Sequence, residues 1–138
     1  MIMKKILLYL WQLPQNLVGL IVLLYAKWFG GINRAYTLQD DIKVYYVDKF
    51  RGGVSLGKYI FIDSSFLRRR GVVYLRNEKT ERHEWGHTRQ SLMFGPLYLL
   101  VIGLPSVVHC IFHNAEKDYE HFFVESWATK LGEKLKWK

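Results

Sequence analysis

His83-Glu84-Trp85-Gly86-His87 is the segment from which the fold and chemistry of this 138-residue chain are best predicted. Residues four apart lie on one face of a helix, so His83 and His87 direct two imidazoles toward one point. Two such imidazoles can bind a tetrahedral Zn²⁺ ion. Glu84 is turned about 100° from His83 around the helix, which suits a general base rather than a ligand.

The helix that carries this segment is expected over residues 80–93. Thr80 is the expected N-cap, and Gly95-Pro96 is a stop signal. Gly86 costs about 1 kcal/mol relative to alanine inside a helix. We therefore expect another backbone, or the floor of a metal site, to approach closely at Gly86. The alternative is a surface helix with two incidental histidines.

The segment resembles the zincin metallopeptidases, in which a His-Glu-x-x-His helix binds catalytic zinc. Most of the chain is also similar to small uncharacterised bacterial proteins of this class with a His-Glu-aromatic-Gly-His helix. They share a strand like 55–62, a run like 95–100 and a motif like 124–132. The resemblance implies an α+β zincin-like fold and a zinc-dependent hydrolase, but no defined substrate.

A third metal ligand is expected from a glutamate, which makes the chain gluzincin-like, because position 93 is methionine rather than a third histidine. The candidates are Glu116, Glu120 and Glu125. Glu125 is favoured because apolar residues surround it in the sequence and a buried acid needs a cation. The resemblance points to the same residue. Alternatively, Glu125 pairs with an arginine or supports packing.

Two residues just before Glu125 are further candidates. His121 lies four residues before Glu125, on the same helix face, and Tyr119 is close in sequence. Either side chain can hydrogen-bond a ligand or stabilise an oxyanion. A packed or solvated side chain is the alternative for both.

The rest of the core region, 36–138, is expected to be a short antiparallel sheet with helices. The strands are expected at Ile42–Val47, Val54–Ile62 and Val72–Leu75, because β-branched and aromatic residues dominate them. A C-terminal helix over 115–137 carries the glutamate. The expected fold class is α+β in a single domain, 1–138, with an apolar helical layer.

Residues 1–31 are largely apolar and are expected to be helical and membrane-associated. Ile6–Phe29 is 24 residues long, but Pro14 is expected to kink it. A buried helix or a helix that docks on a partner is the alternative. The second apolar stretch, Leu97–Phe112, cannot cross a membrane once, since the metal ligands on either side must meet. A break at Gly103–Ser106 is expected to fold it into a helical hairpin.

Charge and cysteine content limit the remaining function classes. The net charge is +8, and residues 34–91 hold 12 Lys/Arg against 7 acids. No nucleic-acid-binding motif accompanies this charge, so no nucleic-acid partner is expected. The basic region suits anionic lipid on the cytoplasmic face, and a soluble cytoplasmic protein is the alternative. The single cysteine excludes cysteine-rich zinc sites.

The expected function is a zinc metallopeptidase that hydrolyses amide bonds in a peptide or protein substrate. Glu84 is expected to act as general base on metal-bound water. The alternative is a non-enzymatic, membrane-associated module in which the metal site is structural or vestigial.

Overall fold

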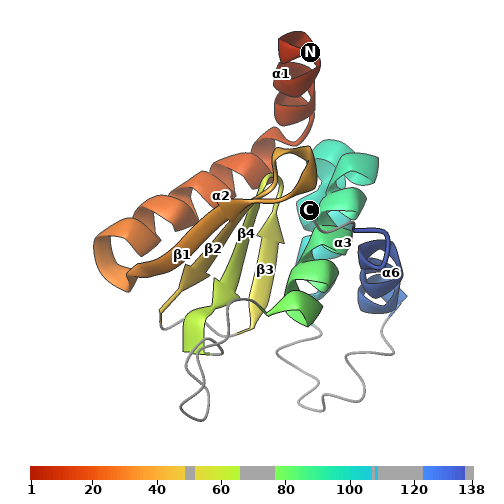
Figure 1. Cartoon of the computed structure of the whole chain (residues 1–138). Coiled ribbons are helices and arrows are strands. Elements are labelled where there is room, and N and C mark those ends of the chain that lie inside the picture. The colour runs from red at the N-terminus through yellow and green to blue at the C-terminus, as the bar shows by residue number, and fades with distance from the viewer. Residues whose placement is uncertain (49–51, 66–76, 107, 109–122, 136–138) are drawn as a thin grey trace.

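Four strands form one mixed sheet in a computed structural model that describes residues 1–48, 52–65, 77–106, 108 and 123–135 (Figure 1). Their order across the sheet is β1-β2-β4-β3. They are β1 (Ile32–Thr37), β2 (Lys43–Val47), β3 (Gly53–Leu56) and β4 (Tyr59–Asp63). With the helices around this sheet, the fold class is α+β, as the sequence predicts.

The prediction of a purely antiparallel sheet is wrong at its centre. β1 pairs with β2 and β3 pairs with β4 in antiparallel fashion, but β2 and β4 run parallel. The expected strand Val54–Ile62 is broken by a two-residue turn in which Gly57 has a φ of +66°. This turn returns β4 into the middle of the sheet and leaves β3 at an edge.

The structure has one strand that the sequence did not predict, and it leaves one predicted strand untested. β1 was not predicted, because Asn33, Arg34 and Ala35 have weak strand propensity, and its pairing with β2 overrides that preference. The expected strand Val72–Leu75 lies outside the described residues.

Alternating side chains bury both faces of the sheet, against α2 (Leu13–Tyr25) on one side and α3 (Glu78–Phe94) on the other (Figure 1). The cluster on the α3 side includes Trp85 and the strand residues Val44, Tyr46, Ile60 and Ile62. The cluster on the α2 side includes Leu23, Ala26, Val47, Tyr59 and Phe61. The middle of the sheet is therefore buried between helices on both faces.

The N-terminal apolar region is two helices rather than one. α1 (Ile2–Trp11) and α2 are separated at Gln12, and α2 continues as a single π-helical turn, Ala26–Gly30. Pro14 lies in the first turn of α2, at the predicted kink. In the described residues no single helix has the length and apolar character to cross a membrane. Helix α1 and the segment Leu13–Gly30 have enough length and apolar character only when they are taken together, and the chain bends by 88° between them.

Helix α3 begins and ends close to its predicted limits, with a different cap. Asn77, not Thr80, is the N-cap residue, and its side-chain oxygen accepts a hydrogen bond from the Thr80 backbone N–H at 3.3 Å. An asparagine amide suits this position as well as a threonine hydroxyl does. The helix ends at Gly95, as predicted.

The region after α3 departs from the expected helical hairpin. A 3₁₀ turn (η4, Gly95–Leu97) leads into a π-helical segment (η5, Leu99–Gly103), and residues 104–106 remain helical. The predicted break at Gly103–Ser106 is therefore wrong, because the backbone stays helical at each of these residues. The C-terminal helix is described over α6 (Phe123–Gly132), and residues 115–122 of the predicted helix lie outside the described residues.

A buried polar contact fixes the start of α3 on the sheet. The Tyr46 hydroxyl donates to the Glu81 carboxyl at 2.7 Å and accepts from the Asn77 backbone N–H at 2.8 Å. Glu81 has no solvent exposure, and burial raises its pKa to about 8, although Arg34 acts to lower it. The folded protein therefore holds a proton on Glu81 at neutral pH.

We predict that Glu81→Gln weakens the pH dependence of folding stability. The pKa of Glu81 is raised from 4.5 to about 8 in the folded protein. Proton binding to Glu81 therefore contributes fully to the free energy of unfolding below pH 4.5, and this contribution is lost as the pH rises through 8. Wild-type stability should fall more steeply over this window, by up to about 1.4 kcal/mol per pH unit. Urea denaturation between pH 4.5 and 9 measures the free energy of unfolding of each variant. The exposed Glu78→Gln is the control, and equal slopes in Glu81→Gln and wild type would contradict the assignment.

Candidate metal centre

Helices α3 and α6 touch through their backbones, and this contact positions the candidate site. A Cβ atom built on Gly86 would lie 1.8 Å from the Ala128 carbonyl oxygen, and one on Gly132 would lie 2.0 Å from the Arg82 carbonyl oxygen. Neither position has room for a side chain. The close approach that the sequence predicts at Gly86 is confirmed, and the partner is the backbone of α6.

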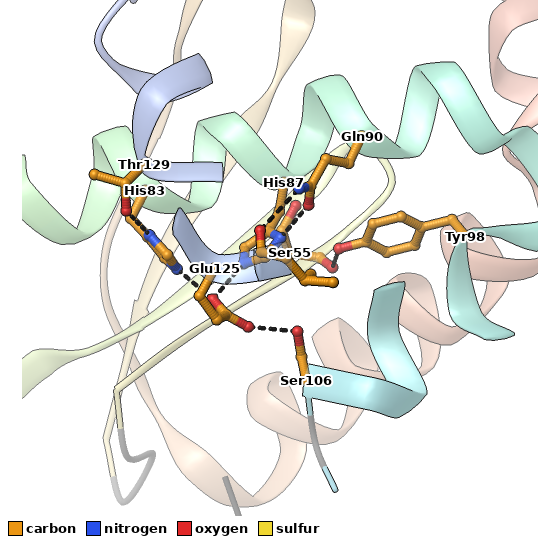
Figure 2. Close-up of polar contacts among 9 residues, drawn as sticks. Ser55, His83, His87, Gln90, Tyr98, Ser106, Glu125 and Thr129 are labelled. Atoms are coloured by element: carbon orange, nitrogen blue, oxygen red, sulfur yellow. Dashed lines mark hydrogen bonds and ion pairs between the residues drawn. The ribbon is translucent and has the colours of Figure 1, made fainter. Parts of the chain in front are cut away.

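This contact brings one residue of α6 over the two histidines of α3 (Figure 2). The Nε2 atoms of His83 and His87 lie 2.8 and 3.0 Å from the same Oε2 atom of Glu125. The ligand atoms of the three residues all lie within 4.8 Å of one another, so the group can hold a metal ion. The structure therefore brings together the three ligands that the sequence predicts.

The opposite nitrogen of each imidazole has its own hydrogen-bond partner. His87 Nδ1 lies 2.6 Å from Gln90 Oε1, and Gln90 Nε2 donates to the Val124 carbonyl at 2.9 Å. The amide orientation makes Gln90 Oε1 an acceptor, so His87 Nδ1 carries a proton. His83 Nδ1 is hydrogen-bonded to the Thr129 hydroxyl at 2.9 Å. Both rings are thus oriented with Nε2 toward Glu125.

The arrangement needs a positive charge at its centre. A neutral His87 with its proton on Nδ1 would face the Glu125 carboxylate with a lone pair. Burial disfavours the charged form of both groups, yet contact with Glu125 raises the pKa of His87, and hydrogen bonds with His83 and then His87 lower the pKa of Glu125. A proton meets this need without metal, and a divalent cation bound by the three ligand atoms meets it as well.

Glu84 lies beside this group, between α3 and the edge strand β3. Its carboxyl is buried, and its Oε1 atom would lie 2.8 Å from a Cβ atom built on Gly53. Glycine at position 53 therefore leaves the space that the carboxyl uses. Burial raises the pKa of Glu84, while His87 and His83 act to lower it.

The η5 region adds two contacts that the sequence did not indicate. The Ser106 hydroxyl hydrogen-bonds Glu125 Oε1, the oxygen that faces away from the histidines (Figure 2). The Tyr98 hydroxyl donates to the Ser55 carbonyl of β3 at 3.1 Å. The segment after α3 therefore touches both a candidate ligand and the edge strand.

Several predicted candidates cannot be placed. Tyr119 and His121 lie outside the described residues, as do the alternative ligands Glu116 and Glu120. Sequence reasoning missed three other polar residues that contact the ligands. Gln90 could have been found, since it is three residues after His87 on the same helix. Thr129 and Ser106 have no local sequence signal, because only the packing of α6 and η5 brings them to the site.

Comparisons with protein-family models, with curated proteins and with solved structures give no match for this chain.

We predict that Gly86→Ala destabilises the protein and weakens zinc binding, because the new methyl group would push α6 away from α3. An overpacked contact of this kind costs about 1–3 kcal/mol. The control is Gly103→Ala, where the added Cβ would meet Leu99 at an ordinary 3.6 Å. Urea denaturation and zinc titration compare the two variants. Equal stability and equal zinc affinity would contradict the close contact.

We predict that Thr129→Val, which is close to isosteric, weakens zinc binding about 10- to 100-fold. Loss of the hydroxyl leaves His83 Nδ1 without the partner that orients the ring. Competition with a fluorescent zinc chelator measures the affinity. Thr37→Val, at an exposed position of β1, is the matched control and should not change it. An unchanged affinity in Thr129→Val would show that this hydrogen bond does not orient the ligand.

Proposed function

We propose that this protein is a zinc-dependent peptidase in which His83, His87 and Glu125 hold the metal and Glu84 is the general base. The observation that supports this most directly is the convergence of two imidazole nitrogens on one carboxylate oxygen. A buried acid lies beside this group, against an edge strand. A structural metal site has no need of that acid.

The donor set fits zinc. Zn²⁺ is bound by imidazole nitrogen and carboxylate oxygen at about 2.0–2.2 Å, and catalytic sites use three protein ligands with one open position. Tetrahedral ligand atoms at that range are about 3.3 Å apart. The two nitrogen–oxygen distances here are 2.8 and 3.0 Å, and all three ligand atoms lie within 4.8 Å of one another, so side-chain adjustment would bring them to the spacing that the ion requires. Within the described residues the group has three members, not four.

The proposed reaction is the hydrolysis of an amide bond. When bound, Zn²⁺ supplies a Lewis acid that polarises the substrate carbonyl and lowers the pKa of water. Glu84 takes a proton from the attacking water as the oxygen–carbon bond forms. It then delivers that proton to the amine nitrogen as the carbon–nitrogen bond breaks. Burial raises the pKa of Glu84, which strengthens the carboxylate as a base toward the attacking water.

The edge strand supports a polypeptide as the substrate. In a two-residue hairpin the residues flanking the turn exchange hydrogen bonds, so Ser55 and Gly53 direct their backbone groups away from β4, to the side of β3 that no described strand covers. The Tyr98 contact occupies the Ser55 carbonyl. An extended segment that pairs beside Gly53 would lie next to Glu84, because β-strand addition aligns a peptide along such an edge.

We predict that Glu84→Gln and His83→Ala separate catalysis from metal binding. The zinc-loaded full chain should cleave unstructured peptides, and mass spectrometry of a mixed peptide pool would identify the products. Glu84→Gln should reduce cleavage at least 100-fold and retain about one zinc per chain, because only the base is lost. His83→Ala should lose both cleavage and stoichiometric zinc.

Glu78→Gln is the matched control, since Glu78 is an exposed acid on the same helix. It should leave zinc content and cleavage unchanged. Full activity in Glu84→Gln would contradict the proposed mechanism. Stoichiometric zinc without cleavage of any peptide in the pool would instead support the alternative, a non-enzymatic module with a structural metal.

A further inference from the structure

Exposed apolar side chains are confined to two parts of the described chain. All the large apolar residues with high exposure lie within 1–29 or 93–108, and the strands and α6 contribute none. We call this the apolar surface. Its members include Leu17, Ile21, Leu24, Trp28, Leu100 and Leu104.

Helix α2 buries its polar residues Gln15 and Asn16 and exposes most of its apolar residues, although Leu23 packs in the core. Gln15 and Asn16 have no solvent exposure, whereas Ile21 and Tyr25 are each 65% exposed. The reverse arrangement is normal for a helix on a protein in water. An apolar outer face with polar residues turned toward the protein is typical of a helix surrounded by lipid.

Hydrogen bonds hold α2 in this orientation. Gln15 Nε2 donates to the Ser91 hydroxyl and to the Gly95 carbonyl, each at 2.8 Å. Asn16 Oδ1 accepts from the Lys58 backbone N–H at 2.8 Å. Rotating α2 to bury its apolar face would break all three hydrogen bonds, so these contacts favour the observed orientation.

The two parts of the apolar surface meet at Trp11. Its indole Nε1 donates to the Leu92 carbonyl at 2.9 Å, and its ring packs on Gly95, where a Cβ atom would lie 2.2 Å away. The junction of α1 and α2 is therefore docked on the end of α3, where η4 and η5 begin. Figure 1 shows α1 projecting from the rest of the fold at this junction, and no residue of α1 is buried.

We propose that the apolar surface lies in one leaflet of an anionic lipid bilayer. The exposed Trp11, Tyr25 and Trp28 have the amphipathic rings that gather at membrane interfaces. The exposed Lys4 and Lys27, with a net charge of +8, complement anionic headgroups rather than a second copy of this basic chain. α1 has 10 residues, about 15 Å, or half the hydrocarbon thickness, so it is too short to span the bilayer, and its lysines place it at the level of the headgroups.

This docking places the candidate metal centre near the lipid headgroups. One segment, 97–106, exposes Leu100 and Leu104 on its outer side. From the same segment Tyr98 reaches β3 and Ser106 reaches Glu125 (Figure 2). The lipid-facing segment and the segment that contacts the candidate ligand are therefore the same. The docking proposal itself does not depend on the proposed catalytic activity.

Vesicle flotation tests the proposal. The full chain is synthesised in a cell-free system containing vesicles of phosphatidylcholine and phosphatidylglycerol, which are then floated through a density gradient. Wild type should float with the vesicles. The double variant Leu17→Glu/Ile21→Glu should show at least a tenfold loss, because two carboxylates on the outer face of α2 oppose both the apolar core and the anionic headgroups.

The matched control is Ala35→Glu/Gln39→Glu, which adds the same two charges at exposed positions away from the apolar surface. It should float like wild type. Circular dichroism checks that both double variants are folded. Equal flotation of Leu17→Glu/Ile21→Glu and wild type would overturn the proposal. A wild type that stays off the vesicles as a defined oligomer in light scattering would also overturn it, since a second copy would then cover the surface.

Discussion

The backbone contact between α3 and α6 is the constraint on which the candidate site depends. Gly86 has no side chain, so the Ala128 carbonyl rests directly on α3. Glu125 is one turn earlier on α6, and this distance of approach alone places its carboxylate between two imidazoles. A side chain at Gly86 or Gly132 would hold α6 farther from α3 and would change the positions of these atoms.

The sheet contributes by holding α3 from the other side. Trp85 packs into the core of the sheet, and Glu81 is joined to Tyr46 of β2 through a buried hydrogen bond. These two residues point toward the sheet, while His83 and His87 point toward α6. One side of α3 therefore packs on the sheet, and another side carries the two candidate metal ligands. Glu84 lies where α3 meets the edge strand.

The apolar surface and the candidate metal centre are linked by the same short segment after α3. Tyr98 and Ser106 contact the edge strand and Glu125, respectively, while their apolar neighbours face outward. The burial of Gln15 and Asn16 and the exposure of most leucines of α2 are the observations that support the proposed lipid contact on that side. The site and the proposed membrane contact are therefore parts of one arrangement.

The local features of this protein could be predicted from the sequence, and the long-range ones could not. The spacing of His83 and His87 and the need for a close contact at Gly86 follow from helix geometry, which acts over a few residues. The α+β class and the position of the Pro14 kink are local in the same sense. Glu125 could be chosen among the acids because buried charge needs compensation.

The parallel pairing of β2 with β4, the Thr129 and Ser106 contacts and the outward apolar face of α2 depended on the tertiary structure. Each is decided by groups far apart in the chain. Strand order depends on which edge is free when the Gly57 turn closes, and ligand orientation depends on how α6 packs on α3. Such choices are made by the sum of many contacts across the molecule, and no short stretch of sequence carries them.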